Sequence, residues 1–545
     1  MKIFNPKILQ TLKGYNGKQL GTDIVAGIIV AIIALPLSIA LAIASGVSPE
    51  KGLYTAIVAG FVIALLGGSR VNISGPTAAF ATIVAGIVAQ FGTSGLVIAT
   101  IMAGLMLIVM GLCKVGSLIK YIPYTITTGF TSGIAITIVI GQLKDFMGLT
   151  FAEGTNAVET MEKIEAVVHS ISTINWQSVL VGLISLAILI VWPKVTKKIP
   201  GSLIVVIIGI VIVKAFNMQV NTIGDLYEIS RSLPKLSVPD FDISLIKSLI
   251  PSAFTIAILA GIESLLSCVV SDGMINDKHD SNTELIAQGA GNICSGLFGG
   301  IPATGAIART AANVNNGGRT PISGIVHAVV LLLILVILMP YAAWIPMPVI
   351  AAILFMVAYN MSEWRHFVGI CKSAPKSDIA VLILTFVLTV VFDLVVAIEV
   401  GLLITMVLFM KRMSDVTEVR SWEEASEDNE RMKTIPKDTR VYEINGPMFF
   451  ATTDKVADIS AEDHIKVVIL RMRNIPMLDI SALRSLKKLY KELCKKEIKV
   501  FFSHMNEQPI SVVKKSGFYE QVGAENFVEN IDVALEKARE YTEEV

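Results

Sequence analysis

Charged side chains are scarce in this chain of 545 residues. Asp, Glu, Lys and Arg make up 17% of it, hydrophobic residues make up 53%, and the mean hydropathy is +0.68. Soluble domains usually carry about 25% charged residues, so the composition excludes an ordinary water-soluble globule. The 45 basic and 45 acidic side chains cancel. Because there is no basic excess, we expect no nucleic-acid partner.

Cysteines and catalytic motifs are also scarce. The five cysteines are scattered and form no CxxC pair, so neither a disulfide framework nor a zinc site is predicted. No GxxxxGK[ST] loop, nucleophile elbow or HExxH pair occurs. These absences exclude an ATP-driven pump within this chain and give no support to an enzyme. We expect no cofactor, unless the carboxylate site described below holds a sodium ion.

The charges that are present are unevenly distributed. Residues 413–545 carry 20 basic and 25 acidic side chains, half of the total in a quarter of the length. This contrast predicts a transmembrane domain over 1–412, a linker over 413–433 and a soluble domain over 434–545. In the soluble domain, runs typical of strands (439–444, 467–472 and 498–502) alternate with helical stretches, which predicts an α/β fold.

About fourteen apolar segments precede the soluble domain. Two of them, 76–90 and 305–316, are too short to cross a hydrocarbon core of about 30 Å as single helices. Residues 67–79 and 299–306 also resemble each other, since each has a Gly-Gly pair that leads through Pro, Gly and Ser or Thr into alanine. We therefore predict a 7+7 inverted repeat, in which the third and tenth segments are half-helices. The predicted segments are 23–45, 52–68, 76–90, 95–113, 122–141, 177–192, 201–217, 248–271, 284–299, 305–316, 320–340, 346–359, 377–392 and 394–411.

An even number of segments places both termini on one side of the plasma membrane. Basic residues such as Arg365, Lys372 and Lys411 fall in the loops of that side, which predicts that it is the cytoplasmic one. Lysines precede the first apolar run and no small-residue cleavage site follows it, so we expect no cleaved signal peptide.

Charged residues inside apolar segments are costly, and Glu263 is the clearest case. Ser267 lies four residues later, on the same face of a helix. A carboxylate with a hydroxyl suits sodium, a cation that prefers oxygen ligands, and a carboxylate removed from water can equally carry a proton. The alternative is a glutamate that only stabilises the packing against a neighbouring helix.

Arg309, in the short tenth segment, is the second candidate. A half-helix that begins inside the membrane directs free backbone N–H groups and the positive end of its dipole at whatever lies there. If the third and tenth segments meet head to head, they form an anion site beside Arg309. Hydroxyls near the helix starts, such as Thr77, add donors. The alternative is that Arg309 extends to the membrane surface or pairs with Glu263.

Several ordered motifs together resemble those of the SulP anion permeases, a family of sulfate, bicarbonate and dicarboxylate transporters. The resemblance covers essentially the whole chain, because the soluble tail resembles the STAS domain of that family. The motifs are Ala-Leu-Pro at 34–36, Ala-Ser-Gly-Val-Ser-Pro at 44–49, Gly-Leu-Tyr at 52–54, Gly-Pro-Thr at 75–77 and Gly-Ile-Glu-Ser-Leu-Leu at 261–266.

The resemblance implies a core and a gate domain, elevator-like movement of one against the other, and a homodimer with cytoplasmic STAS domains. It places the substrate between the third and tenth segments, where Pro76 and Thr77 face the tenth-segment residues. The coupling-ion carboxylate falls on Glu263, its hydroxyl partner on Ser267 and the basic residue on Arg309. Backbone ligands of the tenth segment fall on Gly305, Ala306 and Ile307.

Four positions differ from those of particular relatives. Leu37 follows Pro36 where many relatives have Gln, and the cyanobacterial sodium–bicarbonate members also have an apolar residue there, which favours bicarbonate. Those members, however, have Asp and Thr where this chain has Glu263 and Ser267, and Glu is typical of proton-coupled relatives. In the tail, Ile480 stands where anti-sigma antagonists carry the phosphorylated Ser, so Asp479 is predicted to be a helix cap.

The predicted function is secondary active transport of a small inorganic or carboxylate anion, coupled to sodium or protons. The alternatives are an anion channel and a membrane sensor that signals to a cytoplasmic partner through the tail. A nucleobase permease would share the architecture of the membrane domain, but the tail argues against it.

Overall fold

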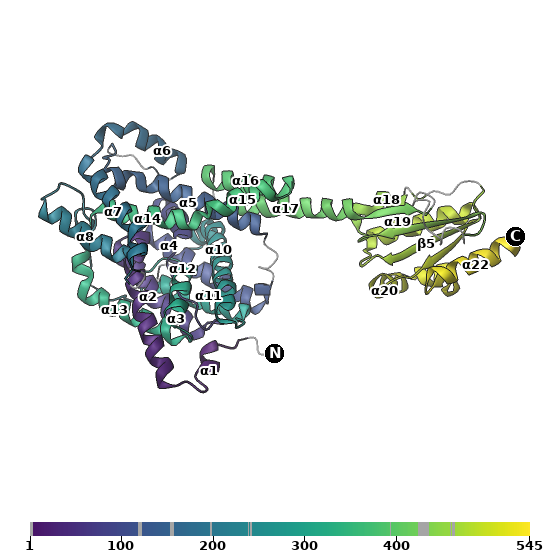
Figure 1. Cartoon of the computed structure of the whole chain (residues 1–545), viewed down its shortest axis with the longest axis horizontal. Helices are drawn as coiled ribbons and strands as arrows, with labels where there is room; N and C mark the ends of the chain where they lie inside the picture. The colour runs from purple at the N-terminus through teal and green to yellow at the C-terminus, as the bar shows by residue number, and fades with distance from the viewer. Residues whose placement is uncertain are drawn as a thin grey trace. The chain divides into compact units, whose positions relative to one another are not determined.

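The computed structural model describes residues 4–117, 123–152, 157, 159–196, 199–230, 232–237, 239, 242–392, 394–422, 435–457, 459 and 464–544. The chain divides into two compact units, Met1–Leu402 and Leu403–Val545. Figure 1 shows the elements of both.

The first unit is helical. Eight helical stretches in its described part are long and apolar enough to cross a membrane, and each of the fourteen predicted segments overlaps a helix. The principal helices are α2 (Gly17–Ala44), α3 (Pro49–Leu66), α4 (Ala81–Leu112), α5 (Tyr124–Met147), α7 (Trp176–Val195), α8 (Gly201–Ala215), α10 (Ile243–Ile275), α11 (Ser281–Leu297), α12 (Ile307–Asn315), α13 (Ile322–Ala342), α14 (Met347–Ser362), α16 (Lys376–Val391) and α17 (Leu394–Val416). Shorter helices are α1 (Lys7–Thr11), α6 (Thr160–His169), α9 (Ile223–Leu226) and α15 (Trp364–Ser373).

The helices of this unit pack in two groups. One contains α2, α3, α4, α10, α11, α12 and α13, and the other contains α5, α7, α8, α14 and α16. Each group takes helices from both the early and the late part of the chain. Contacts between the groups are made mainly by α2, which packs on α5, α8 and α14, and α5 also touches α4.

The third and fourth predicted segments join into α4. The joint is Gly92, whose φ of 68° and ψ of −173° lie in a region that side chains with a Cβ rarely adopt. The glycine therefore lets the backbone leave the helix and re-enter it at once. Before α4, a short 3₁₀ turn (Ala78–Phe80) begins the third segment.

Two short strands precede the third and tenth segments. β1 (Ser74–Gly75) and β2 (Thr304–Gly305) are antiparallel, with Ser74 opposite Gly305. The residue before a proline favours extended backbone, which suits Gly75 before Pro76. The helix after β2, α12, has nine residues and a length of about 14 Å, less than half of a hydrocarbon core.

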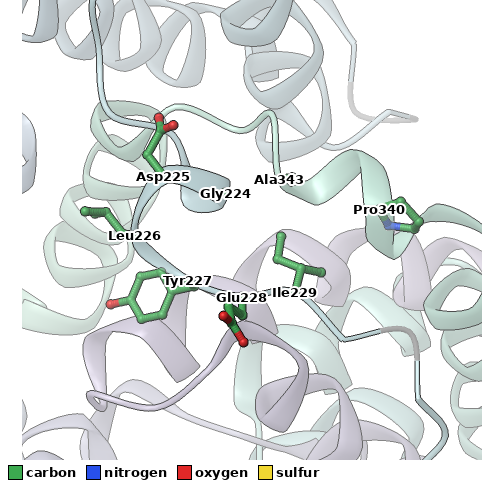
Figure 2. Close-up of a pocket in the computed structure, with 8 residues that line it drawn as sticks. All are labelled: Gly224, Asp225, Leu226, Tyr227, Glu228, Ile229, Pro340 and Ala343. Carbon is green, nitrogen blue, oxygen red and sulfur yellow. The ribbon is translucent and has the colours of Figure 1, made fainter.

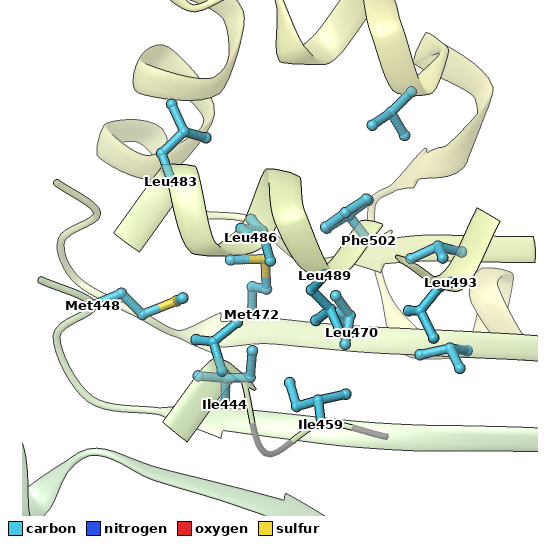
Figure 3. Close-up of a cluster of buried hydrophobic side chains, with 14 of the residues drawn as sticks. Ile444, Met448, Ile459, Leu470, Met472, Leu483, Leu486, Leu489, Leu493 and Phe502 are labelled. Atoms are coloured by element: carbon cyan, nitrogen blue, oxygen red, sulfur yellow. The ribbon is translucent and has the colours of Figure 1, made fainter. Parts of the chain in front are cut away.

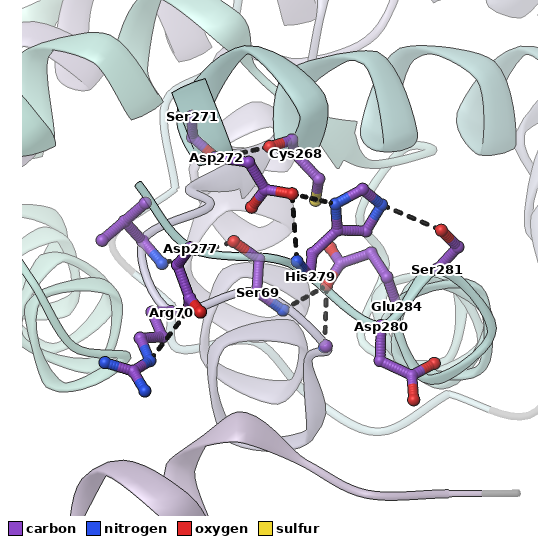
Figure 4. A network of polar contacts seen from close by, with 12 residues as sticks. Ser69, Arg70, Cys268, Ser271, Asp272, Asp277, His279, Asp280, Ser281 and Glu284 are labelled. Carbon is purple, nitrogen blue, oxygen red and sulfur yellow. Dashed lines mark hydrogen bonds and ion pairs between the residues drawn. The ribbon is translucent and has the colours of Figure 1, made fainter. Parts of the chain in front are cut away.

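Polar contacts hold together the end of the unit where α10 leads into α11 (Figure 4). His279 Nδ1 lies 2.7 Å from Asp272 Oδ2, and His279 Nε2 lies 2.9 Å from Ser281 Oγ. Asp277 pairs with Arg70 at 2.9 Å and with Lys7 at 3.3 Å. Burial raises the pKa of Asp277, but the amide of Lys278 and the Lys7 and Arg70 charges outweigh it, so the pKa lies below its usual value.

The second unit is a five-stranded sheet with helices on both faces. The strand order is β3 (Glu418–Ser421), β4 (Thr439–Asn445), β5 (Val467–Asn474), β6 (Lys499–Ser503) and β7 (Phe527–Val528). β3 is antiparallel to β4, and the other pairs are parallel. The helices of the unit are α18 (Thr453–Ala457), α19 (Ile480–Lys495), α20 (Glu507–Lys515), α21 (Phe518–Val522) and α22 (Ile531–Glu544).

The sheet of the second unit separates two apolar clusters. On one face, leucines at helical spacing on α19, including Leu486 and Leu489, pack against Leu470 and Phe502 (Figure 3). On the other face, Ala534 and other residues of α22 cover the alternate side chains of β4, β5 and β6. The parallel strands, buried on both faces, explain the short continuous apolar runs in this part of the sequence.

The predicted linker, 413–433, differs from the structure. α17 continues to Val416, and Glu418–Ser421 forms β3 at the edge of the sheet. The acidic composition of this stretch conceals a strand, because an edge strand exposes alternate side chains to solvent. The remaining residues of the predicted linker, 423–433, lie outside the described residues.

We expect Gly289→Ala to destabilise the first unit, because α4 and α11 touch through glycine. A Cβ on Gly289 would lie 2.5 Å from the carbonyl oxygen of Gly104, closer than any normal contact. Overpacking of this kind costs about 1–3 kcal/mol, so the purified protein should melt several degrees lower. Gly86→Ala, elsewhere on α4, is the matched control because a Cβ there meets nothing within 4 Å. Equal melting temperatures for the two variants would contradict the close contact.

Candidate functional site

Two helix starts meet in the first unit. Thr77 precedes the 3₁₀ turn that leads into α4, Ala306 precedes α12, and no side chain caps either start. The pairing of β1 with β2 places these starts on adjacent strands, and the Ala306 amide donates to the carbonyl oxygen of Ile73 at 2.8 Å. Helix starts without caps leave N–H groups free, and the positive ends of both dipoles lie there. The arrangement suits a negatively charged group.

Glu263 lies beside the first of these helix starts. It comes from α10, and its Oε2 accepts a hydrogen bond of 3.0 Å from the Thr77 hydroxyl. The side chain is partly exposed, as are Thr77 and Ala306, and Ile307 is 44% exposed. The carboxylate is thus accessible at the same place as the uncapped helix starts.

No hydrogen bond joins Ser267 to Glu263, although the structure describes both residues. It is fully buried, and its hydroxyl contacts Asn72 Oδ1 at 2.8 Å and Thr310 Oγ1 at 3.1 Å. Four residues along a helix advance about 6 Å, so Ser267 lies one turn of α10 deeper than the carboxylate. The hydroxyl that Glu263 actually meets is that of Thr77.

Asn72, Ser267 and Thr310 form a small buried cluster that fixes the extended segment before β1. Thr310 Oγ1 lies 3.0 Å from Asn72 Oδ1 and accepts from the Ile73 amide at 3.0 Å. The cluster therefore joins α10 and α12 to the strand between them. In the structure, Ser267 holds the scaffold of the site.

Arg309 is 3% exposed, on α12. Its Nη2 donates to the carbonyl oxygen of Pro76 at 3.1 Å, and its Nη1 has no hydrogen-bond partner in the described part of the chain. Among the described residues it makes no ion pair, so it neither pairs with Glu263 nor extends to the surface. A buried guanidinium without a counter-charge is unfavourable unless an anion joins it.

Two glycines permit this close packing. A Cβ on Gly75 would lie 2.4 Å from Arg309 Nη1. A Cβ on Gly305 would lie 2.7 Å from Asn72 Nδ2 and 3.1 Å from the Cα of Ser264. At both positions any larger residue would displace a group of the site. Ser264 also accepts the Gly305 amide at 3.0 Å, which ties β2 to α10.

Glu284 is a buried carboxylate that is not among the predicted site residues. It is 1% exposed on α11, and it accepts from the amides of Gly68 and Ser69 at 2.9 and 3.2 Å. It also accepts from Asn72 Nδ2 at 2.8 Å and from Gln288 Nε2 at 2.9 Å. A glutamate at the start of an apolar segment resembles an ordinary first-turn residue, so the sequence alone gives no signal for it. Through Asn72 it orients the cluster that Ser267 joins.

Two hollows elsewhere in this unit involve none of the predicted site residues. One, of about 480 Å³, is lined by residues 224–229 with Pro340 and Ala343 (Figure 2). Another, of about 330 Å³, includes Lys144, Asp145 and Phe151. In the part of the chain that the structure describes, no three His, Cys, Asp or Glu residues group as a metal site.

The fold and the site together define a multi-pass membrane protein in which two uncapped helix starts lie beside a carboxylate and a buried arginine. Comparison with known families agrees with this class. The model of the sulfate permease family matches residues 20–385, and the STAS domain model matches residues 430–534. The chain belongs to the sulfate permease family, known as SulP, and carries a C-terminal STAS domain.

Two relatives match this chain over nearly its whole length and over nearly their own. The putative sulfate transporter YvdB of Bacillus subtilis is 40% identical over 527 residues, which cover 95% of this chain and 98% of that protein. The bicarbonate transporter BicA of a Picosynechococcus species is 32% identical over 538 residues, 95% of this chain and 94% of that protein.

Two solved structures resemble the chain. The transmembrane domain of a cyanobacterial BicA has a TM-score of 0.64 and 33% identity, and the match covers 70% of this chain and 98% of that one. The overall structure of SLC26A9 has a TM-score of 0.84 over 99% of this chain and 93% of that one. At 18% identity this second likeness shows the fold alone.

We expect Glu284→Gln to destabilise the site, since an amide would face donors with its own NH₂ group. Leaving donors to a buried carboxylate without a partner costs about 2–3 kcal/mol in the free energy of unfolding. The melting temperature of the purified protein and its transport rate should both fall. Glu228→Gln is the matched control, because Glu228 is an exposed glutamate at the first hollow. A Glu284→Gln protein as stable as this control would contradict the role of Glu284.

Proposed function

We propose that the protein is a secondary active transporter of small anions that works by alternating access. The single observation that supports this most directly is Arg309, a buried cation without a counter-charge beside two uncapped helix starts. One full positive charge and two half-dipoles suit a small anion, and this is sufficient compensation for a monovalent one. The proposed substrate contacts are Pro76 and Thr77 on one side and Ala306, Ile307 and Arg309 on the other.

The substrate class follows from the relatives. One is named as a putative sulfate transporter and another as a bicarbonate transporter. The proposed substrates are therefore bicarbonate, sulfate or a dicarboxylate. Leu37 favours bicarbonate by its resemblance to the cyanobacterial members.

Coupling to sodium or a proton is assigned to Glu263. The carboxylate and the Thr77 hydroxyl, 3.0 Å apart, offer sodium two oxygen ligands, and backbone groups of Gly305, Ala306 and Ile307 lie on the strand and helix opposite. The same carboxylate can instead carry a proton. Ser267 enters this proposal as the residue that holds β1 and α12 in place, since its hydroxyl is engaged with Asn72 and Thr310.

The movement that we propose is elevator-like. The group of helices that contains α4, α10 and α12 carries the site, and it would move against the group that contains α5 and α14. The proposed setting is a homodimer in the plasma membrane with both termini and the STAS domain in the cytoplasm, where that domain meets a partner still to be identified.

Uptake into proteoliposomes tests the proposal. Labelled bicarbonate, sulfate and fumarate are offered separately under an inward sodium gradient and under an inward proton gradient. Saturable uptake that depends on one gradient supports coupled transport and identifies the ion. Anion flux that is independent of both gradients and does not saturate would instead establish a channel, and no flux of any anion would leave the sensor hypothesis.

Glu263→Gln is expected to reduce gradient-driven accumulation to the level of protein-free vesicles, because the amide takes up no proton and has no negative charge to attract a sodium ion. Folding should be preserved, since Gln can still accept from Thr77. Accumulation measured over time checks this. Glu50→Gln, another largely buried glutamate but in the first turn of α3, is the matched control and should retain coupling. Normal accumulation by Glu263→Gln would contradict the assignment of Glu263 as the coupling residue.

Arg309→Ala should weaken anion binding about 30-fold or more, which corresponds to the loss of about 2–3 kcal/mol from a charge-assisted contact. Half-saturation in the uptake assay measures this. Arg309→Lys keeps the charge without the planar fork and should lose less. An unchanged half-saturation for Arg309→Ala would show that the arginine only supports Pro76.

A further inference from the structure

A histidine that the proposed transport mechanism does not use lies buried close to Arg309. His327 is on α13 and is fully buried, and in the described part of the chain neither of its ring nitrogens has a hydrogen-bond partner. Arg309 Nη1 also lacks one. Three nitrogen atoms in one buried region therefore lack partners, although buried polar groups are nearly always satisfied.

The packing of α13 explains why the two side chains are near each other. Gly324, one turn before His327 on the same face, is packed against the Ile73 side chain, with the Asn72 carbonyl 4.0 Å from a Cβ built at Gly324. The strand that follows Ile73 ends at Gly75, against which Arg309 Nη1 lies. One extended segment, residues 72–75, thus lies between α13 and the Arg309 guanidinium, and the Arg309 charge acts on the His327 ring across it.

In the described part of the chain, no carboxylate forms an ion pair with Arg309 or a hydrogen bond with His327. On α10, Glu263 bonds to Thr77, and on α11, Glu284 is engaged by four donors. On α2, Asp23 accepts from Thr320, from the Arg319 amide and from two side chains at the start of the helix.

The remaining titratable groups on α3 and α13 lie within the first or last two turns of their helices. α3 contributes Glu50 and Lys51 in its first turn and Tyr54, whose hydroxyl donates to the Ser232 carbonyl. α13 itself contributes Tyr341, in its last turn. The charge that His327 meets is thus the positive charge of Arg309.

The charge of an anion bound at Arg309 decides what His327 can do. Without an anion, a proton on His327 would place two cations together in a medium of low dielectric constant, which is strongly unfavourable. A monovalent anion cancels Arg309 alone and leaves no further negative charge. A divalent anion has one negative charge more than Arg309 balances, and that charge attracts a proton to the imidazole of His327.

We propose that His327 takes up one proton when a divalent anion binds at Arg309, so that the positive charge of the site matches the charge of the anion. The proton comes from the solution that delivers the anion, binds at a free ring nitrogen, and returns to solution when the anion leaves. His327 is in this sense a specificity-determining residue for divalent over monovalent anions. The inference rests on the proposed function, because it requires that Arg309 binds the transported anion.

Proton uptake on binding tests the proposal directly. Sulfate, fumarate and nitrate are titrated calorimetrically into the purified full-length protein at about pH 7.5, above the ordinary pKa of histidine, in buffers of different ionisation enthalpy. The dependence of the heat on the buffer gives the number of protons bound with each anion. We expect about one proton with sulfate or fumarate and about none with nitrate.

His327→Gln is the decisive variant, because glutamine fills the same space, keeps a polar group and does not take up a proton. It should bind sulfate without proton uptake, and at least tenfold more weakly relative to nitrate than the parent protein does. His327→Asn serves as a second variant if the first is not monodisperse. Glu50→Gln, which changes a largely buried glutamate outside the site, should keep the proton uptake and so shows that the loss is specific to His327.

The same measurements separate a failure of the His327 inference from a failure of the proposed anion site. If Arg309→Ala binds all three anions as tightly as the parent protein, the anion site itself is misplaced. If Arg309→Ala loses binding but sulfate brings no proton to the parent protein, the inference about His327 is overturned. It is equally overturned if His327→Gln takes up the same number of protons, or if nitrate binds and neither divalent anion does.

Discussion

The pairing of β1 with β2 is the contact on which the rest of the site depends. Two residues from each strand, Ser74–Gly75 and Thr304–Gly305, satisfy backbone groups that would otherwise be unpaired inside a membrane domain. Because the pair is antiparallel, the chain leaves each strand in the opposite direction, and a helix begins at each exit. The charge of the site is therefore produced first by the backbone, and side chains only complete it.

The polar groups around this pair are arranged in layers. The helix starts, Thr77 and Glu263 are partly accessible, whereas Ser267 and Glu284 are buried and bonded to the strand segments. The accessible groups could exchange their hydrogen-bond partners for an ion. The buried groups are held in place by their hydrogen bonds. Such a division suits a transporter, because substrate contacts must form and break while the scaffold that presents them remains rigid.

Much of the architecture was predictable from the sequence. Hydropathy locates the membrane segments because every residue of a spanning helix meets an apolar environment, and short glycine- and proline-rich segments such as 305–316 reveal where a helix begins inside the membrane. The strands β4, β5 and β6 were predictable because they are buried on both faces. β3 was not, since one residue out of two in an edge strand faces water and the stretch is acidic.

The site was predictable in part. Glu263 and Arg309 stand out because charge inside an apolar run is rare, and the structure places both beside the helix starts. The partner of Glu263 was not predictable from helical periodicity. That rule pairs residues within one helix, whereas Thr77 reaches the carboxylate from a segment 186 residues away. Glu284 and His327 were not predicted for the same reason. Glu284 matters because other segments donate hydrogen bonds to it, and His327 because no described residue does.

If Arg309 binds the transported anion as proposed, the unpaired guanidinium also links the stability of the protein to the salt around it. An anion that binds the folded site and not the unfolded chain stabilises the fold by RT ln(1 + [L]/Kd), about 2.7 kcal/mol at a hundredfold excess over Kd. Buffer anions that fit the proposed site would therefore add to the stability of the folded protein. Large organic anions that cannot enter between the helix starts would leave Arg309 without a counter-ion. In such a buffer the free energy of unfolding would be lower.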